Sequence, residues 1–538
     1  MTQIIHKSHF NALDLPELPL GDYVLQRYNQ NPGLLGEKTA IIDGDTGEIW
    51  NYREFSDHVA EFAGGLAEKG IKTESVVALI APNCPAFAIS FHAVIRLGAT
   101  VTTVNPQYTS REIHQQLCEC DPQIIITVSD KLEAAIKAAS GTSIKSIILL
   151  DAGKTPTASL SNDSQQLEIL FWKDCLGEPQ AQRSLNARST IAVLPFSSGT
   201  TGIPKGVKLS HFNLVANVIQ SNTAQQYKES DVALAVLPFF HIYGMQVLMN
   251  CLLAQQVPIV TMRRFDMDAA LALIEKHRVT RFFAVPPIVL GLAKHPAVEQ
   301  YDISCLQQVF SGAAPLGGDI AEEAARRIDC PVVQGYGMTE LSPVSHMTVG
   351  SDYKTGSSGV TIANTECRIV DEEGNDQPCG EIGELWVRGP QVMVGYHNNE
   401  SATRECLDED GWLRTGDVAR IDDDNHMTIV DRLKELIKYK GFQIAPAELE
   451  AAIIAFPEVA DVAVIGVADA DAGEAPKAFI KMQKDKNLSL AQLNQRLSSE
   501  LSSYKKIREL EIVDQIPKSA SGKILRQVLR KSQAEKSS

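Results

Sequence analysis

The sequence lacks the features that mark several large classes of protein. None of its ten cysteines stands in a CxxC pair, and their spacing does not suggest a disulfide framework. The opening "MTQIIHKSHFNALDLPEL" contains no apolar signal core, and no run of 18 apolar residues occurs. The chain ends "QAEKSS", without the peroxisomal address Ser-Lys-Leu. We therefore expect a cytoplasmic protein with free thiols and no membrane span.

Positive charge is also in short supply. The chain carries 66 acidic against 50 basic residues, a formal net charge of -16, which disfavours non-specific binding to nucleic acid or anionic lipid. With 538 residues, 44% of them apolar, it is too long for one ordinary core, so two or more folded domains are expected. The expected partners are small molecules, and either a monomer or a homodimer is compatible with the sequence.

Three common catalytic and nucleotide-binding motifs are missing. No Walker A pattern is present, and no G-x-G-x-x-G occurs, since "GYGMTE" has Glu340 where the third glycine would stand. There is no G-x-S-x-G nucleophile elbow. These absences argue against a P-loop nucleotide-binding module, a dinucleotide-binding enzyme and a serine hydrolase.

Short β-branched runs recur along the first 350 residues, each followed by turn residues and a helical period. Examples are "SVVALIAP", "IIITV", "SIILL", "VALAVLP", "VPIVTM" and "RFFAVP". This pattern predicts an α/β fold with parallel sheets covered by helices. After about residue 350, "ECRIVDEEGNDQPCGEIGELWVRGP" alternates and turns as antiparallel strands or a small β-barrel would.

A domain boundary is expected near 431–434, where a charged stretch precedes a new helix. It divides the chain into an N-terminal domain, 1–433, and a small, mobile α+β C-terminal domain, 434–538. The latter is predicted to contain helices over 445–457 and 490–507 and a strand over 459–469.

One loop is unusually rich in small and hydroxyl residues. The stretch "PFSSGTTGIPKGVKLSH", Pro195 to His211, combines glycines with serines, threonines and Lys205. Glycines let the backbone approach a ligand closely, so that successive N–H groups can point at one anion, and Lys205 adds a positive charge. The pattern favours a phosphate-binding loop. A flexible linker is the alternative, because Gly/Ser stretches are common in linkers.

Six further motifs follow this loop in order. They are "SGAAPLGG" (311–318), "VVQGYGMTELSP" (332–343), "GELWVRG" (383–389), "GWLRTGDVA" (411–419), "DRLKELIKYKGFQIAPAELE" (431–450) and "PKSASGKILR" (517–526). In this set the sequence resembles the adenylate-forming superfamily of acyl- and aryl-CoA synthetases, adenylation domains and luciferases. Within it, "LPFFHIYGM" and "LIKYKGFQIAPAELE" look most like the 4-coumarate:CoA ligases.

The resemblance implies a reaction in two steps. A carboxylate attacks the α-phosphate of ATP in the presence of Mg²⁺ and releases pyrophosphate, and the thiol of coenzyme A then attacks the acyl adenylate. ATP, Mg²⁺ and coenzyme A are therefore the expected cofactor and co-substrates, and a small carboxylic acid is the expected substrate. Because like charges meet in the first step, preorganised cations and donors should supply most of the rate.

The resemblance also implies which residues contact ATP. Glu340 of "GMTE" would help to bind Mg²⁺, and Asp417 of "RTGD" would hold the ribose. Lys523 would bridge the attacking carboxylate and the α-phosphate, and His241 would be a gate residue beside it; these two are the expected catalytic residues. The expected ATP- and AMP-binding residues are Ser197, Ser198, Gly199, Thr200, Thr201, Lys205, Gly335, Tyr336, Gly337, Thr339, Asp417, Arg432 and Lys438.

Taken without the resemblance, several of these residues have an ordinary structural alternative. A Thr339-Glu340 pair is typical of a helix cap, and Asp417 after a glycine is typical of a turn. Lys523 in a basic tail reads as a solvated charge, and His241 reads equally well as a neutral core histidine.

An unmodified carboxylic acid is expected, because the aspartate that amino-acid-activating relatives carry near the position of His241 is absent. Phe310 stands where many plant hydroxycinnamate ligases have Lys or Met, which removes a handle for a ring hydroxyl. We expect 4-coumarate or a related hydroxycinnamic or aryl acid, with a medium- or long-chain fatty acid as the alternative and carrier loading or a luciferase-like reaction less favoured. The expected substrate-binding residues are His241, Tyr243, Phe310, Gly312, Gly335, Pro343 and Val344.

The resemblance implies that the C-terminal domain changes its position between the two steps. Lys434 falls where the family has its hinge. After the swing, Lys440, Gly441 and Phe442 of "KYKGF" would bind coenzyme A, with Gly441 lining the pantetheine tunnel.

Overall fold

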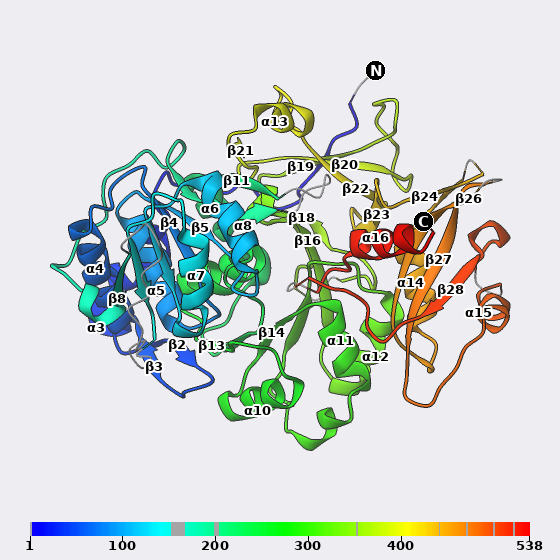
Figure 1. Cartoon of the computed structure of the whole chain (residues 1–538), viewed down its shortest axis with the longest axis horizontal. Helices are drawn as coiled ribbons and strands as arrows, with labels where there is room; N and C mark the ends of the chain where they lie inside the picture. The colour runs from blue at the N-terminus through cyan, green and yellow to red at the C-terminus, as the bar shows by residue number, and fades with distance from the viewer. Residues whose placement is uncertain are drawn as a thin grey trace.

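The computed structural model describes residues 3–151, 167–197, 204–350, 353–440, 442–469, 472–498, 501–519 and 522–537. A large N-terminal part contains two mostly parallel sheets with their helices and a third, antiparallel sheet (Figure 1). A smaller C-terminal unit, orange and red in Figure 1, lies beside it. This is the α/β architecture with a small C-terminal unit that the sequence predicted.

The first sheet contains, among the described residues, a parallel run β9-β5-β4-β6-β7-β8, extended at the β9 edge by β11, which pairs antiparallel with β10, β9 and β21. Its central strands are buried on both faces, which explains their continuous β-branched runs. The bounds are β4 Val76–Ile80, β5 Thr100–Thr103, β6 Ile124–Thr127, β7 Ser146–Leu149, β8 Glu168–Phe171, β9 Ile191–Val193, β10 Phe196–Ser197, β11 Lys205–Ser210 and β21 Gly395–Tyr396.

The second sheet has the order β18-β17-β16-β15-β14-β12-β13-β2-β3 and is parallel from β16 to β2. Its strands come from distant parts of the chain, since β2 pairs with β13 in the register Asp43↔Thr261. The bounds are β2 Thr39–Asp43, β3 Ile49–Asn51, β12 Ala233–Ala235, β13 Ile259–Thr261, β14 Arg281–Ala284, β15 Gln308–Ser311, β16 Val332–Gly337, β17 Val344–Met347 and β18 Val360–Thr361.

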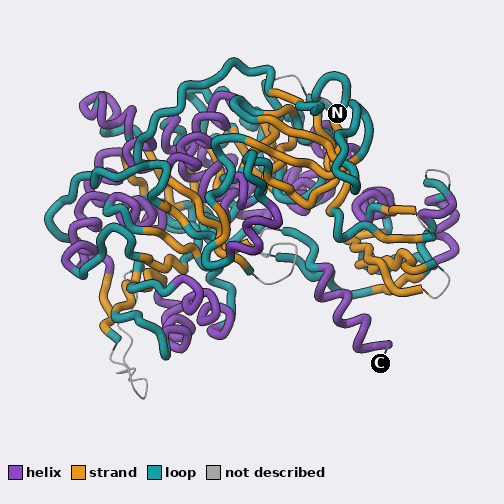
Figure 2. The backbone as a smooth tube through the Cα atoms, turned by 90° about the horizontal axis from the view of Figure 1, so that it is seen from above, coloured by secondary structure: helices purple, strands orange, loops and turns teal. Residues whose placement is uncertain are grey.

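Helices cover these sheets, as the tube in Figure 2 also shows. The helix α4 illustrates how the sequence forms them: Asn51 and Glu54 make a capping box, and Phe55, Val59 and Phe62 fall on one buried face. The bounds are α1 Leu20–Val24, α2 Gln26–Gln30, α3 Pro32–Leu35, α4 Tyr52–Glu68, α5 Pro85–Arg96, α6 Ser110–Cys120, α7 Leu132–Ala139, α8 His211–Gln225, α9 Cys251–Gln255, α10 Met267–His277, α11 Pro286–Lys294, α12 Gly318–Ile328 and α13 Glu400–Cys406. A π-helix, Tyr243–Asn250, leads directly into α9.

The third sheet is antiparallel, with the order β1-β19-β20-β22-β23 in the described part of the chain. Of the two expectations, antiparallel strands or a small barrel, the structure shows an open antiparallel sheet. The edge strand β1 is only two residues long and pairs with β19 alone, so it does not close the sheet. The bounds are β1 His6–Lys7, β19 Glu366–Val370, β20 Gly383–Arg388, β22 Leu413–Ile421 and β23 Met427–Arg432.

The C-terminal unit has a sheet of its own and a separate hydrophobic core, which begins at Ile437. Its centre is the antiparallel hairpin of β26 and β27, with β24 and the parallel β28 on β27. The bounds are β24 Ile437–Tyr439, β25 Phe442–Ile444, β26 Val459–Asp469, β27 Gly473–Met482, β28 Glu509–Ile512, α14 Pro446–Ile454, α15 Leu490–Leu497 and α16 Arg526–Ser537.

The helix predicted over 490–507 is shorter than expected. It ends at Leu497, and the next regular element among the described residues is a short 3₁₀ turn at Ser503–Lys505. The reason is the serine-rich sequence: the Ser498 hydroxyl donates a hydrogen bond to the Gln495 carbonyl, one of the local side-chain bonds that compete with helix.

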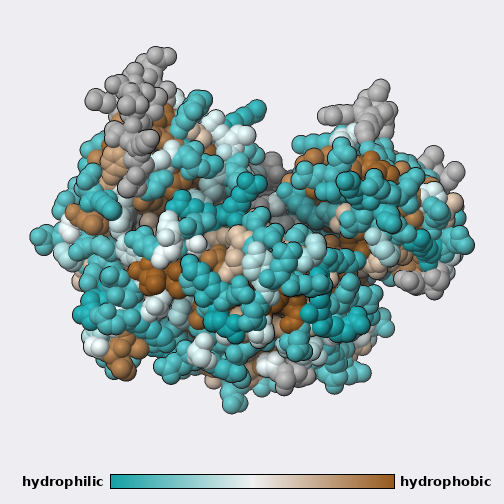
Figure 3. Space-filling view, turned by 90° about the horizontal axis from the view of Figure 1, so that it is seen from below, coloured by the Kyte–Doolittle hydropathy of each residue, from teal (hydrophilic) through white to brown (hydrophobic). Residues whose placement is uncertain are grey.

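One face of the molecular surface is mainly polar (Figure 3). Figure 3 shows hydrophilic side chains over most of this face, with apolar patches scattered among them. Among the helices in the described ranges, none combines the length and the apolar character that crossing a membrane requires.

Candidate active site

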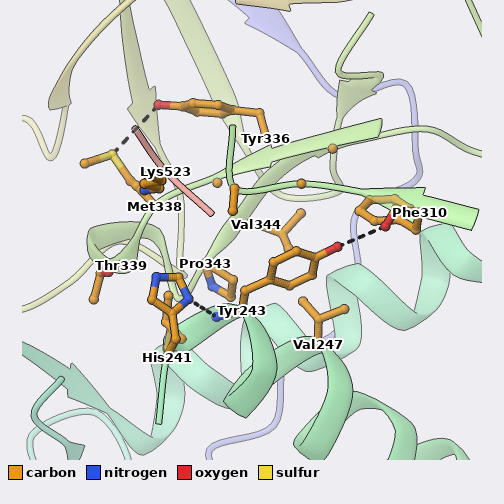
Figure 4. Close-up of a pocket in the computed structure, with 15 residues that line it drawn as sticks. His241, Tyr243, Val247, Phe310, Tyr336, Met338, Thr339, Pro343, Val344 and Lys523 are labelled. Atoms are coloured by element: carbon orange, nitrogen blue, oxygen red, sulfur yellow. Dashed lines mark hydrogen bonds between the residues drawn. The ribbon is translucent and has the colours of Figure 1, made fainter. Parts of the chain in front are cut away.

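A pocket opens where the carboxyl ends of β15 and β16 meet the π-helix, which is where parallel α/β sheets commonly hold their ligands (Figure 4). Its wall is mostly apolar and aromatic, and the space between its atoms, together with the solvent at its open mouth, is about 480 Å³. Lys523 of the C-terminal unit reaches its edge. The residues that line it are His241, Ile242, Tyr243, Val247, Phe310, Gly312, Ala313, Gly335, Tyr336, Gly337, Met338, Thr339, Pro343, Val344 and Lys523.

Two glycines make room for aromatic rings in this wall. A Cβ atom on Gly335 would lie 2.5 Å from the ring of Phe310, and one on Gly312 would lie 2.9 Å from the ring of Tyr243. The Tyr243 hydroxyl donates a hydrogen bond of 3.3 Å to the Phe310 carbonyl (Figure 4). The far part of the pocket is therefore flat-walled, and its tyrosine hydroxyl is already engaged.

His241 is a neutral imidazole. Burial and the nearby charge of Lys523 lower the pKa of His241 to about 3. The backbone N–H of Tyr243 donates to its Nδ1 at 3.3 Å, which leaves the proton on Nε2 (Figure 4). The side chain is thus a hydrogen-bond donor at the pocket edge and carries no charge at neutral pH.

Lys523 sits between charges of both signs. Burial and the neighbouring Arg432 lower its pKa to about 8, while Asp417 and Glu340 favour the charged form. The loop that carries it is held by its own hydrogen bonds: the Lys523 N–H donates to the Ser519 hydroxyl and its carbonyl accepts from the Ser519 N–H. Arg526, the first residue of the following helix α16, donates from Nη2 to both carboxylate oxygens of Glu450 and so anchors that helix.

Asp417 links the second and third sheets. It lies directly opposite Arg432 in the antiparallel pairing of β22 with β23, and the Arg432 Nε lies 3.3 Å from Asp417 Oδ1. Its other oxygen accepts a hydrogen bond of 2.6 Å from the Tyr336 hydroxyl at the end of β16. A carboxylate held in this way can accept hydrogen bonds from vicinal hydroxyls, as a ribose presents.

Glu340 is a buried carboxylate in the turn after β16. Two hydroxyls donate to its Oε1, Ser197 at 2.8 Å and Tyr396 at 2.9 Å. No described residue makes a hydrogen bond to Oε2. The side chain therefore has an oxygen without a hydrogen bond from the described residues, beside the strand pair in which Ser197 is opposite Lys205.

The carboxylate oxygen of Glu340 is a suitable ligand for Mg²⁺. The ion prefers oxygen ligands and keeps several waters when the protein supplies few of them. In the described ranges, no group of three or more His, Cys, Asp or Glu side chains could hold a metal ion. Glu340 would consequently share the ion with phosphate oxygens and water.

The structure brings most of the predicted site residues together. All seven predicted substrate-binding residues line the pocket, as do Tyr336, Gly337, Thr339 and Lys523. Lys438 and Phe442 lie instead on strands of the C-terminal sheet, and Lys440 is a turn residue directly after β24. The centre of the Phe442 ring is 4.5 Å from that of the Tyr504 ring, on which it stacks. The predicted residues Ser198, Gly199, Thr200, Thr201 and Gly441 lie outside the described residues.

Sequence reasoning missed some residues of this site. Val247 could have been found, because it follows Tyr243 by one helical turn. Tyr396 carried only the weak signal of a glycine-tyrosine pair in "VMVGYHNNE". Nothing in the sequence indicated that it would meet Glu340, 56 residues away.

Comparison with known proteins agrees with this geometry. The model of the AMP-binding enzyme family matches residues 30–397, and that of the AMP-binding enzyme C-terminal domain matches 448–523. A 4-coumarate–CoA ligase from Oryza sativa subsp. japonica is 38% identical, with 98% of this chain and 97% of the relative covered. A 4-coumarate–CoA ligase from Arabidopsis thaliana is also 38% identical, with 98% and 95% covered.

Solved structures show the same architecture. ATP-bound MatB from Rhodopseudomonas palustris has a TM-score of 0.84 at 26% identity, with 96% of this chain and 99% of that chain covered. An anthranilate CoA ligase, AuaEII, in complex with anthranoyl-AMP has a TM-score of 0.88 at 24% identity, with 98% and 100% covered, and supports the fold alone.

The chain belongs to the AMP-binding enzyme family. It is an AMP-forming acid–CoA ligase, which works in two steps and uses ATP, Mg²⁺ and coenzyme A with a small carboxylic acid.

Proposed function

We propose that the acid is 4-coumarate or a related hydroxycinnamic or aryl acid. The observation that carries this proposal is the pocket between the π-helix and β16, whose far wall is made flat by Gly312 and Gly335 beside two aromatic rings. A planar ring would fill such a slot with its carboxylate at the edge where His241 and Lys523 lie. The names of the relatives support the same class of acid.

For the first step, Lys523 supplies the positive charge that bridges the acid carboxylate and the α-phosphate. Repulsion between these anions peaks as they approach, so a cation held in place lowers the barrier. His241, as a neutral donor, orients the carboxylate without competing for the phosphate. Asp417 binds the ribose hydroxyls, with Tyr336 and Arg432 as its supports.

The leaving pyrophosphate is held on the other side of the site. Lys205 and the glycine-rich loop from Ser197 bind the β- and γ-phosphates, while Thr339 and the 335–337 strand end contact the α-phosphate and the adenine. Glu340 binds Mg²⁺, which when present neutralises charge on the phosphates.

For the second step, we infer that the C-terminal unit, 434–538, turns about Lys434 so that the β24–β25 hairpin replaces the Lys523 loop. Lys438, Lys440, Gly441 and Phe442 then bind coenzyme A. The separate core of this unit supports such a motion, since that core can move as one body, while the small apolar cluster of Val418 with Leu436 and Ala445 has to come apart.

The second candidate substrate is a medium- or long-chain fatty acid. One observation favours it. The Tyr243 hydroxyl already donates its hydrogen bond to the Phe310 carbonyl, so it has no proton to donate to the ring hydroxyl of a hydroxycinnamic acid. An alkyl chain needs no such donor.

A panel of acids distinguishes the two candidates. Acid-dependent exchange of pyrophosphate with ATP is measured for cinnamic, 4-coumaric, benzoic, octanoic and palmitic acids. Cinnamic-type acids should give kcat/KM values at least about tenfold above the fatty acids, which is the discrimination that one well-fitted group provides. Equal rates across the panel, or faster exchange with palmitic acid, would refute the aryl preference.

We also infer a cytoplasmic location. All ten cysteines are free, as expected for a protein that folds in a reducing compartment. Microscopy of a fluorescent fusion tests this directly, with diffuse cytoplasmic signal expected and an organelle pattern as the contrary result.

A further inference from the structure

Tyr396 lies between two charged groups that the proposed function assigns to ATP and Mg²⁺. Its hydroxyl donates to Oε1 of Glu340 at 2.9 Å, and the Lys205 ammonium lies 5.0 Å from the centre of its ring. Both contacts are side-chain contacts, and both come from one buried residue. No motif or comparison assigns a role to this tyrosine.

The backbone explains how the chain reaches this arrangement. The short strand β21 pairs antiparallel with β11, so that Tyr396 is opposite Val207 (Figure 1). Lys205 is two residues before Val207 and points to the same face, which makes it a diagonal neighbour of Tyr396. The sheet register therefore sets the position of the lysine over the ring.

The other side of the same segment is tied to the turn that carries Glu340. The Met393 N–H donates to the Glu340 carbonyl at 2.9 Å, and the Tyr396 N–H donates to the Thr403 hydroxyl at 2.9 Å. Gly395 has φ +146°, and a Cβ atom there would lie 2.9 Å from Thr403. The tyrosine is thus fixed by its own backbone and does not depend on ATP for its position.

The chemistry of these contacts suits a support for a metal ligand. Because Ser197 and Tyr396 both donate to Oε1, the carboxylate is held in one orientation, in which Oε2 accepts no hydrogen bond from the described residues and can bind a cation. The ring face attracts the ammonium of Lys205 without neutralising it, so the lysine keeps its full charge for phosphate.

We propose that Tyr396 is a positioning residue that holds the metal-binding carboxylate of Glu340 and the phosphate-binding ammonium of Lys205 in one rigid frame. This inference rests on the proposed roles of Glu340 and Lys205. It predicts that the hydroxyl of Tyr396 strengthens ATP binding through Mg²⁺ on Glu340, whereas the ring strengthens it through Lys205.

The two parts can be separated by two substitutions. Tyr396→Phe removes the hydroxyl and keeps the ring, and Tyr396→Leu removes both. Tyr52→Phe is the matched control, because Tyr52 is also buried, its hydroxyl donates to the Leu253 carbonyl at 2.9 Å, and it lies outside the site. Melting temperatures of all variants report any general loss of stability.

The readout is equilibrium binding of ATP by calorimetry, with Mg²⁺ and with EDTA. Tyr396→Phe should bind ATP about tenfold more weakly with Mg²⁺, as expected for a lost hydrogen bond to a charged group, and within about twofold of the wild type with EDTA. Excess Mg²⁺ should restore its affinity. Tyr396→Leu should bind more weakly in both conditions, and Tyr52→Phe should bind as the wild type does.

Other results would overturn the inference. If Tyr396→Phe binds Mg²⁺-ATP as tightly as the wild type, or loses the same factor with EDTA, the hydroxyl has no role through the metal. Glu340→Ala is measured in parallel: if it keeps full Mg²⁺-dependent affinity, the proposed role of Glu340 is wrong, whereas if it loses that affinity and Tyr396→Phe does not, only the inference fails.

Discussion

Lys523 illustrates how much of this site depends on the environment of single side chains. The Lys523 side chain can stabilise phosphate only in its protonated form, yet burial and Arg432 lower its pKa to about 8. His241, by contrast, stays neutral across the physiological range because its pKa is near 3. The pH dependence of the first step should accordingly follow the lysine.

We predict that kcat/KM for ATP in acid-dependent pyrophosphate exchange falls as pH rises through about 8. The sign follows from the charge: below this pKa the ammonium is present in the free enzyme, and above it the neutral amine cannot stabilise the phosphate. Lys523→Arg should show no such decline up to about pH 10, because a guanidinium stays protonated. Identical profiles for the two proteins would contradict the assignment.

Gly335 should determine the width of the pocket. A Cβ atom at this position would lie 2.5 Å from the ring of Phe310 and 3.1 Å from the His346 carbonyl, so the ring must move into the pocket or the strand must shift. Gly335→Ala should raise KM for cinnamic acid about tenfold and affect acetate much less.

The matched control for this change is Gly33→Ala, because a Cβ atom on Gly33 meets nothing within 4 Å. Steady-state kinetics with both acids provide the test. An equal rise in KM for cinnamic acid and acetate would mean that Gly335 does not shape the aryl slot.

At the scale of elements, the β24–β25 hairpin and the Lys523 loop occupy the same C-terminal unit but different places in the structure. Lys523 reaches the pocket, whereas Phe442 is half exposed and stacks on Tyr504. One arrangement cannot present both to the same substrate, which agrees with a reaction in two steps.

We predict that Phe442→Ala spares the first step and impairs the second. The ring makes no contact with the pocket residues, so pyrophosphate exchange should stay within about twofold of the wild type. Thioester formation should slow about tenfold, as truncation of an aromatic contact residue commonly does. Ile512→Ala, an exposed apolar residue of the same unit, is the control, and a loss of exchange in Phe442→Ala would contradict the division of roles.

At the scale of the whole molecule, the sequence predicted the elements better than their arrangement. Strands such as β6 and β7 could be predicted because their β-branched runs and flanking turns are local signals. The pairing of β2 with β13 could not, because no local signal connects segments so far apart in the chain. The antiparallel strands expected after residue 350 are present, but whether they closed into a small barrel could not be predicted; in the described residues they form an open sheet.

The residues of the candidate site also differ in whether the sequence could predict them. Asp417, Lys523 and Tyr243 could be predicted because each stands in a motif that resembles a known family. Tyr396 could not, because its role depends on the register of β21 against β11 and on a turn in another sheet. Local chemistry is visible in a sequence, whereas contacts between elements require the structure.

The central claim is that Lys523 serves adenylate formation and not transfer to coenzyme A. It is tested by measuring both half-reactions for Lys523→Ala, one as acid-dependent pyrophosphate exchange and one as thioester formation from a supplied acyl adenylate. Exchange should fall at least about 100-fold, as on removal of a preorganised charge-stabilising group, while thioester formation stays within a few-fold of the wild type. Equal losses in both half-reactions, or exchange at the wild-type rate, would contradict the account.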